Sequence, residues 1–94
     1  MAVVIIRHRI EDFPKWKKEF DAFVEKRRAG GEKSFRIAGM TGDKNNLCLV
    51  FDWDSAANAK RFVDSSELAA AMKRAGVTET PEIWIAEDLA SGRT

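Results

Sequence analysis

The stretch "VVIIRHRIEDFPKWKKEF", residues 3–20, decides the fold because a strand and a helix meet within it. The chain is continuously apolar from residue 2 to Ile6, which is typical of a strand covered on both faces, and we expect this strand over residues 2–10. Asp12 then predicts a helix N-cap, with Pro14 in the first turn, where a missing N–H costs nothing.

Apolar residues recur at helical spacing after this cap and predict a helix over residues 13–29, ended by Gly30 and Gly31. The alternating segment "KSFRIAGMTG", residues 33–42, predicts a strand, and the apolar run at residues 47–53 predicts its hairpin partner. The intervening "GDKNN" is typical of a turn, because its residues tolerate positive φ.

A second helical region follows this predicted hairpin. Asp54 or Ser55 is expected to cap it, and Asp64 with Glu67 resembles a capping box that restarts the helix at a new angle as far as Gly76. Pro81 then opens a last strand over residues 82–89. The order β-α-β-β-α-β predicts one α+β, ferredoxin-like domain over residues 1–94, with a four-stranded antiparallel sheet and both helices on one face.

Composition limits the classes of function. Sixteen basic and fifteen acidic residues give a net charge of +1, which offers no drive toward nucleic acid or an anionic membrane. Cys48 is the single cysteine and lies in an apolar run, so we expect a small buried hydrophobe and no disulfide or cysteine-based metal site. No leader or membrane-spanning run is expected, and a cytoplasmic protein is the default.

Three segments resemble one family of proteins. They are "RHRIEDFPKWKKEF" at residues 7–20, "FDWDSAANAKRFVDSSELAAAMKRAGV" at residues 51–77 and "PEIWIAEDL" at residues 81–89. Together they look like the dimeric α/β-barrel superfamily, above all its small cyclase-like and antibiotic-biosynthesis-monooxygenase-like members. The resemblance implies two ferredoxin-like protomers packed sheet to sheet, with a cavity against the sheet. Its members include cofactor-free oxygenases, haem-degrading enzymes and proteins without known activity.

The resemblance also bears on cofactors. Haem-degrading members pair an Asn on the first strand with a Trp on the third and a His on the second helix. This chain has Trp53 at a matching place, but it has no Asn on its first strand and no His on its second helix. We therefore expect no haem and no other cofactor.

The candidate site residues are His8, Trp53, Arg36 and Trp84. His8 is the only histidine, and its ordinary pKa of about 6.5 suits proton transfer near neutrality. A structural role at the strand end is the favoured interpretation, and His8 is the first residue to test. Trp53 and Trp84 offer aromatic walls for a flat ligand or serve only as core or interface. Arg36 would face a phenolate, a partner chain or solvent.

Two hypotheses about function are favoured, and a purely structural or stress-related role is a third class that remains open. One is a small-molecule-binding protein with a cavity against its sheet; the other is a cofactor-independent monooxygenase or polyketide-cyclase-like enzyme acting on an aromatic substrate. Whether His8, Arg36 and Trp53 converge on one cavity discriminates between the hypotheses. Because apolar residues occupy both faces of the predicted sheet, we also expect a homodimer formed through the sheet faces.

Overall fold

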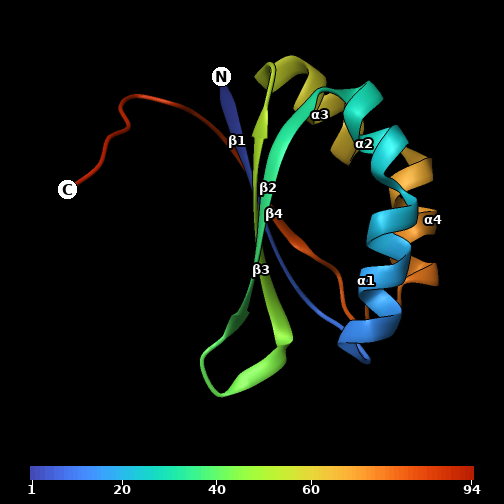
Figure 1. The fold of residues 1–94 in the computed structure, drawn as a ribbon. Coiled ribbons are helices and arrows are strands. Elements are labelled where there is room, and N and C mark those ends of the chain that lie inside the picture. Colours follow the sequence, from blue (N-terminus) through green and yellow to red (C-terminus); the bar gives the residue numbers. More distant parts are fainter.

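The computed structural model describes residues 1–94, with the elements in the order β-α-α-β-β-α-α-β (Figure 1). Their bounds are β1 Ala2–Arg9, α1 Phe13–Ala22, α2 Val24–Gly30, β2 Glu32–Met40, β3 Asp43–Trp53, α3 Ala56–Val63, α4 Ser66–Arg74 and β4 Glu82–Glu87. Each of the two predicted helical regions therefore consists of two consecutive helices.

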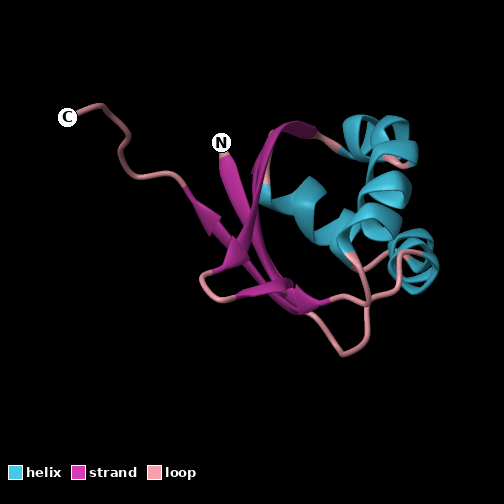
Figure 2. Ribbon diagram, turned by 60° about the horizontal axis from the view of Figure 1, so that its bottom comes forward, coloured by secondary structure: helices cyan, strands magenta, loops and turns pink.

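The strands form one antiparallel sheet in the order β2-β3-β1-β4. All four helices lie on one face of this sheet, and no other element covers the opposite face (Figure 2). The C-terminal residues after β4 extend away from the body on the side of that uncovered face (Figure 1). This arrangement confirms the predicted ferredoxin-like α+β fold.

The first helical region begins as predicted and differs from the prediction in its middle. Asp12 is the N-cap and accepts a hydrogen bond from the backbone N–H of Lys15 at 3.2 Å. Gly31 ends the region with a φ of 120°, a backbone conformation that residues with a side chain rarely adopt. The prediction of a single helix is wrong, because Phe23 interrupts it between α1 and α2. The Phe23 ring packs against Phe62 of α3, with 6.0 Å between the ring centroids.

Two other local predictions also need correction. Ser65, and not Asp64, caps α4 by accepting a hydrogen bond from the backbone N–H of Leu68 at 3.2 Å. The hairpin turn is shorter than predicted, since only Thr41 and Gly42 separate the strands and β3 already begins at Asp43. Pairing with β2 and β1 therefore outweighs the turn-forming preference of residues 43–46.

The core lies between the sheet and the helices. Even-numbered residues of β1 and, from Leu47 on, odd-numbered residues of β3 are buried there, among them Val4, Ile6, Leu49 and Phe51. The opposite side chains form what we call the open face, since partners in the register lie on the same side of a sheet. The open face comprises Val3, Ile5, Arg7, Ser34, Arg36, Ala38, Cys48, Val50, Asp52, Glu82, Trp84 and Ala86.

The four helices are short, with 7 to 10 residues each. None of them combines the length and the apolar character that crossing a bilayer demands.

Candidate functional site

A cavity of about 60 Å³, here called the inner cavity, lies between the sheet and the helices. Its floor is formed by inward-facing residues of β1 and β3, and its roof by residues of all four helices, of which α1, α3 and α4 supply the aromatic and aliphatic ones and α2 supplies Arg27. Because 14 of its 17 lining residues are hydrophobic, a molecule bound there would contact mostly apolar side chains and very few polar groups. Such a lining is typical of small-molecule sites, in which a few polar groups fix the orientation of the ligand.

His8 is one of those few polar groups. It lies near the end of β1 on the helix face and is only 2% exposed, opposite Leu47 of β3. Its ring packs edge-on against Trp16 of α1, with 5.9 Å between the centroids. Both ring nitrogens, Nδ1 and Nε2, are buried, and neither has a hydrogen-bond partner within the protein. Since buried polar groups are nearly always hydrogen-bonded, these two nitrogens are exceptional.

Burial also sets the protonation state of His8. Loss of hydration, together with the nearby charge of Arg7, lowers its pKa from 6.5 to about 4, while the charge of Glu79 acts in the opposite direction. His8 is therefore neutral at physiological pH. A neutral imidazole offers one N–H donor and one lone-pair acceptor, so the ring can both donate and accept a hydrogen bond.

Trp53 also lines the inner cavity, but only with its ring. It is 1% exposed, and its indole Nε1 donates a hydrogen bond to the carbonyl oxygen of Gly30 at 2.9 Å. Its ring packs against Phe62 with 4.9 Å between centroids. Because its donor is already used, Trp53 can supply an apolar wall but no further hydrogen bond from its indole N–H.

Arg27 of α2 is a lining residue that was not among the sequence candidates. It is 4% exposed and donates hydrogen bonds to the carboxylate of Glu32, at 2.8 Å, and to the carbonyl oxygen of Phe20. Its guanidinium carbon lies 3.7 Å from the centre of the Phe20 ring. The signal was present in the sequence, because Arg27 continues the apolar stripe of the first helical region.

Glu32, the partner of Arg27 in this ion pair, also has a buried side chain. Loss of hydration raises the pKa of the Glu32 carboxyl, while the charge and hydrogen bond of Arg27 act in the opposite direction. The pair holds the end of α2 against the start of β2 at the wall of the inner cavity. We therefore regard Arg27 as a structural cation of the wall.

Arg36 and Trp84 do not join His8 and Trp53. Arg36 pairs in register with Val50, and Trp84 with Ile5, which places both on the open face. Trp84 is 50% exposed, and the Arg36 side chain has neither an ion pair nor a hydrogen bond in the structure. The alternation of a strand separates them from the inner cavity, so only two of the four candidates converge there.

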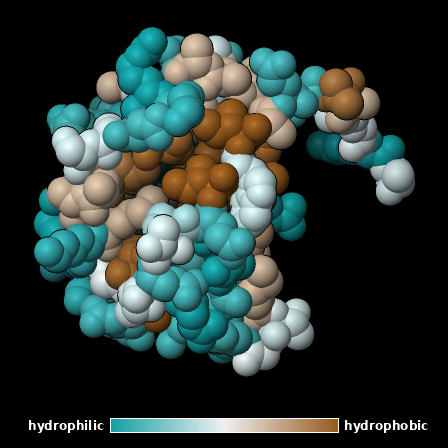
Figure 3. All heavy atoms as spheres, turned by 180° about the vertical axis from the view of Figure 1, so that it is seen from behind, coloured by the Kyte–Doolittle hydropathy of each residue, from teal (hydrophilic) through white to brown (hydrophobic).

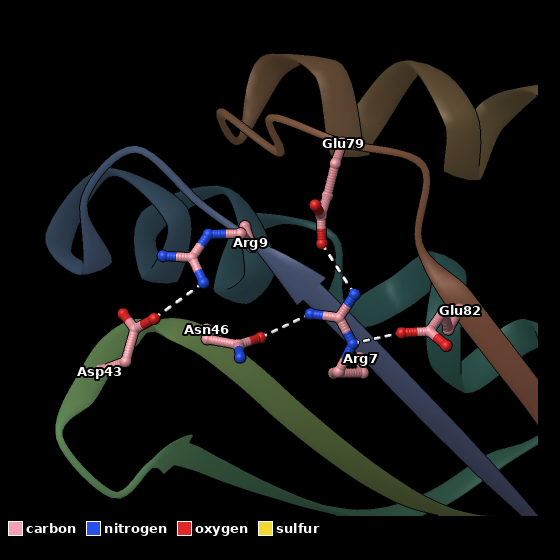
Figure 4. A network of polar contacts seen from close by, with 6 residues as sticks. All are labelled: Arg7, Arg9, Asp43, Asn46, Glu79 and Glu82. Carbon is pink, nitrogen blue, oxygen red and sulfur yellow. Dashed lines mark hydrogen bonds and ion pairs between the residues drawn. The ribbon is translucent and has the colours of Figure 1, made fainter.

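Two further arginines, Arg7 and Arg9 of β1, form hydrogen bonds and ion pairs with side chains of the same chain (Figure 4). Arg7 donates hydrogen bonds to Asn46 at 2.6 Å, to Glu79 at 2.8 Å and to Glu82. Arg9 pairs with Asp43 at 2.7 Å. These contacts join β1 to the hairpin and to the segment before β4, and they account for both arginines without a ligand.

No cluster of three or more histidine, cysteine, aspartate or glutamate side chains has an arrangement that could hold a metal ion.

Comparison with known proteins supports the fold. No protein-family model matches the chain, and no curated protein matches it in sequence. Among solved structures, SnoaB from Streptomyces nogalater, a cofactor-independent oxygenase, is similar with a TM-score of 0.73 and 11% identity, over 96% of this chain and 94% of that chain. An antibiotic biosynthesis monooxygenase is similar with a TM-score of 0.69 and 13% identity, over 96% and 100%.

A third structure, Rv0793 from Mycobacterium tuberculosis, is similar with a TM-score of 0.66 and 17% identity, over 98% of both chains. At these identities a likeness shows the fold and leaves the chemistry open. The chain has the ferredoxin-like α+β fold that antibiotic biosynthesis monooxygenase-like proteins share.

Proposed function

We propose that the protein binds a small, mostly apolar molecule in the inner cavity, with His8 as its hydrogen-bonding anchor. The observation that carries this proposal is the pair of unpartnered, buried ring nitrogens beside an apolar cavity. Leaving a buried polar group unsatisfied costs about 1–3 kcal/mol, so a ligand that restores the hydrogen bonds regains that free energy.

The lining defines the chemistry of the ligand. A hydroxyl or carbonyl group would pair with neutral His8, and the rest of the molecule would contact aromatic and aliphatic walls. A free carboxylate would have to shed its hydration without a counter-charge, because Arg27 is already paired with Glu32. A neutral aromatic or aliphatic molecule with one hydroxyl group fits this environment best.

The likeness to SnoaB favours a second candidate, a cofactor-independent oxygenase or cyclase-like enzyme acting on an aromatic substrate. In that role His8 would accept a proton from the substrate, and the cavity walls would orient the ring. However, a general base works best when its pKa lies near the operating pH, and the pKa of His8 lies near 4. The lowered pKa makes His8 a weak base, so we favour binding over catalysis.

Titration with phenol and with benzoate tests the binding proposal. Trp16 and Trp53 line the inner cavity, so their fluorescence reports on occupancy. We expect phenol to bind the wild-type protein, benzoate to bind at least tenfold more weakly, and His8→Leu to lose most of the phenol affinity. Equal phenol affinity in wild type and His8→Leu, or no binding at all, would refute it. Oxygen uptake with a hydroxylated aromatic substrate tests the enzymatic alternative.

We also infer that a second copy of the chain covers the open face. The face carries Val3, Ile5, Val50 and Trp84, of which Val50 and Trp84 are exposed in the single chain. A contiguous apolar surface of this kind is typical of a protein interface. Arg36 and Asp52 lie on the same face without an ion pair, so two-fold packing of equal patches offers each of them an opposite charge.

A further inference from the structure

The inner cavity is small for a ligand site. It measures about 60 Å³, whereas typical ligand pockets have roughly 300–1,000 Å³. A molecule of ordinary metabolite size that reached His8 would therefore need more space than the inner cavity provides. Such a molecule would have to extend into a neighbouring hollow of the surface.

A second hollow of about 280 Å³, here called the β4 groove, lies between α4 and the edge strand β4. Its lining includes Met72 of α4, Val77 and Pro81 of the connecting segment, and Ile83 of β4. Six of its eight lining residues are hydrophobic. Figure 3 views the molecule from the side opposite to that of Figure 1 and shows apolar side chains gathered near the middle of this face, between hydrophilic ones.

Three residues line both spaces, namely Val63, Leu68 and Met72. The inner cavity and the β4 groove are therefore separated by the thickness of these side chains. Met72 is only partly buried, and a methionine has three rotatable side-chain bonds, which let it adopt other shapes at low cost. The Met72 side chain is therefore the most adaptable of the three that separate the two spaces.

We propose that the β4 groove is the second compartment of the ligand site, reached past Met72, and that it holds the apolar tail of an elongated ligand whose hydroxyl end meets His8. The inference rests on the proposed binding function and adds the length and shape of the ligand. Its occupant is a chain or ring without charge, because Lys73 is the only charged residue in the lining and its side chain lies at the exposed rim.

A series of phenols with unbranched para-alkyl chains, from phenol itself to para-hexylphenol, tests the proposal. Each methylene that enters an apolar compartment should raise affinity roughly three- to fourfold. We expect affinity to rise along the series in the wild-type protein and to stay flat in Met72→Trp, whose larger side chain closes the passage. Met40→Ala, a change at the exposed end of β2, serves as the control and should behave like wild type.

Nuclear magnetic resonance of the wild-type protein gives a readout that does not depend on the folding of a variant. The chain has three methionines, Met1, Met40 and Met72, so isotope-labelled methionine methyl groups give three signals. Because Met72 lines both spaces, phenol should already shift its signal, para-hexylphenol should shift it much further, and the other two signals should stay in place.

Two results would overturn the second compartment while leaving the proposed function intact. One is phenol binding that depends on His8 but weakens as the alkyl chain grows. The other is an equal rise in affinity in wild type and Met72→Trp, with a Met72 methyl shift from para-hexylphenol no larger than the shift from phenol. Failure of phenol to bind at all, or binding that ignores His8→Leu, would instead refute the proposed function itself.

Discussion

His8 packs edge-on against Trp16 at 5.9 Å between ring centroids, yet neither of its ring nitrogens has a hydrogen-bond partner in the protein. The contact fixes the ring through an apolar surface and leaves its polar atoms facing an apolar environment. This arrangement stabilises the position of His8 and costs free energy at the same time. Such a cost is typical of a group retained for binding or chemistry.

Replacing His8 by leucine should therefore stabilise the folded protein. The variant removes two unsatisfied polar atoms and retains an apolar side chain of similar size, so we expect the free energy of unfolding to rise by about 1–3 kcal/mol. His8→Asn keeps polar atoms in the same place and should lower it. Chemical denaturation monitored by circular dichroism measures both. A leucine variant less stable than the wild type would assign His8 a structural role.

The stability of the protein should depend on pH through His8. The unfolded chain binds a proton at His8 below pH 6.5, whereas the folded protein does so only near pH 4. The free energy of unfolding therefore falls as pH decreases from 6.5 to 4, and His8 contributes up to roughly 3 kcal/mol of that fall. Above pH 6.5 this contribution disappears.

The same leucine variant isolates this dependence, because carboxyl groups titrate alike in both proteins. The advantage of His8→Leu in unfolding free energy should grow as pH decreases from 6.5 to 4. Arg7 and Glu79, which act on the His8 pKa in opposite directions, are unchanged in the comparison. A difference that stays constant over this range would show that His8 titrates normally in the folded protein.

Removal of Arg27 should destabilise the fold far more than removal of an exposed cation. Arg27→Met leaves the Glu32 carboxylate buried without its partner, which should cost about 3–5 kcal/mol. Lys60→Met breaks the exposed pair with Asp64 and should cost less than about 1 kcal/mol. The double variant Arg27→Met with Glu32→Gln should recover part of the loss. Equal effects of Arg27→Met and Lys60→Met in denaturant titrations would contradict this assignment.

The open face should mediate dimerisation. Light scattering coupled to size exclusion should give twice the 10.6 kDa mass of one chain for the wild type and a single-chain mass for Trp84→Glu. The charge would lie within the apolar part of the open face, which disfavours association. Phe13→Ser changes an exposed aromatic residue at the start of α1 and should remain dimeric. A folded wild-type monomer at micromolar concentration would refute the dimer.

Most of the fold could be predicted from local sequence. The cap at Asp12, the glycine stop at Gly31 and the apolar periodicities all report on nearby residues, and the structure confirms them. The interruption at Phe23 could not be predicted, because no proline or glycine marks it and a contact with Phe62 of α3 accompanies it. Likewise, the strand residues 43–46 resemble a turn until their pairing partners are known.

The candidate site was predictable only in part. The sequence by itself determined that the odd and even residues of β1 lie on opposite sides, because side chains alternate along every strand. It did not determine which side the helices cover, since both sets begin with apolar residues and end with polar ones. Only the tertiary structure placed His8 and Trp53 at the inner cavity and Arg36 and Trp84 on the open face. The physical reason is that packing of helices on a sheet depends on contacts between distant segments, which a local pattern does not contain.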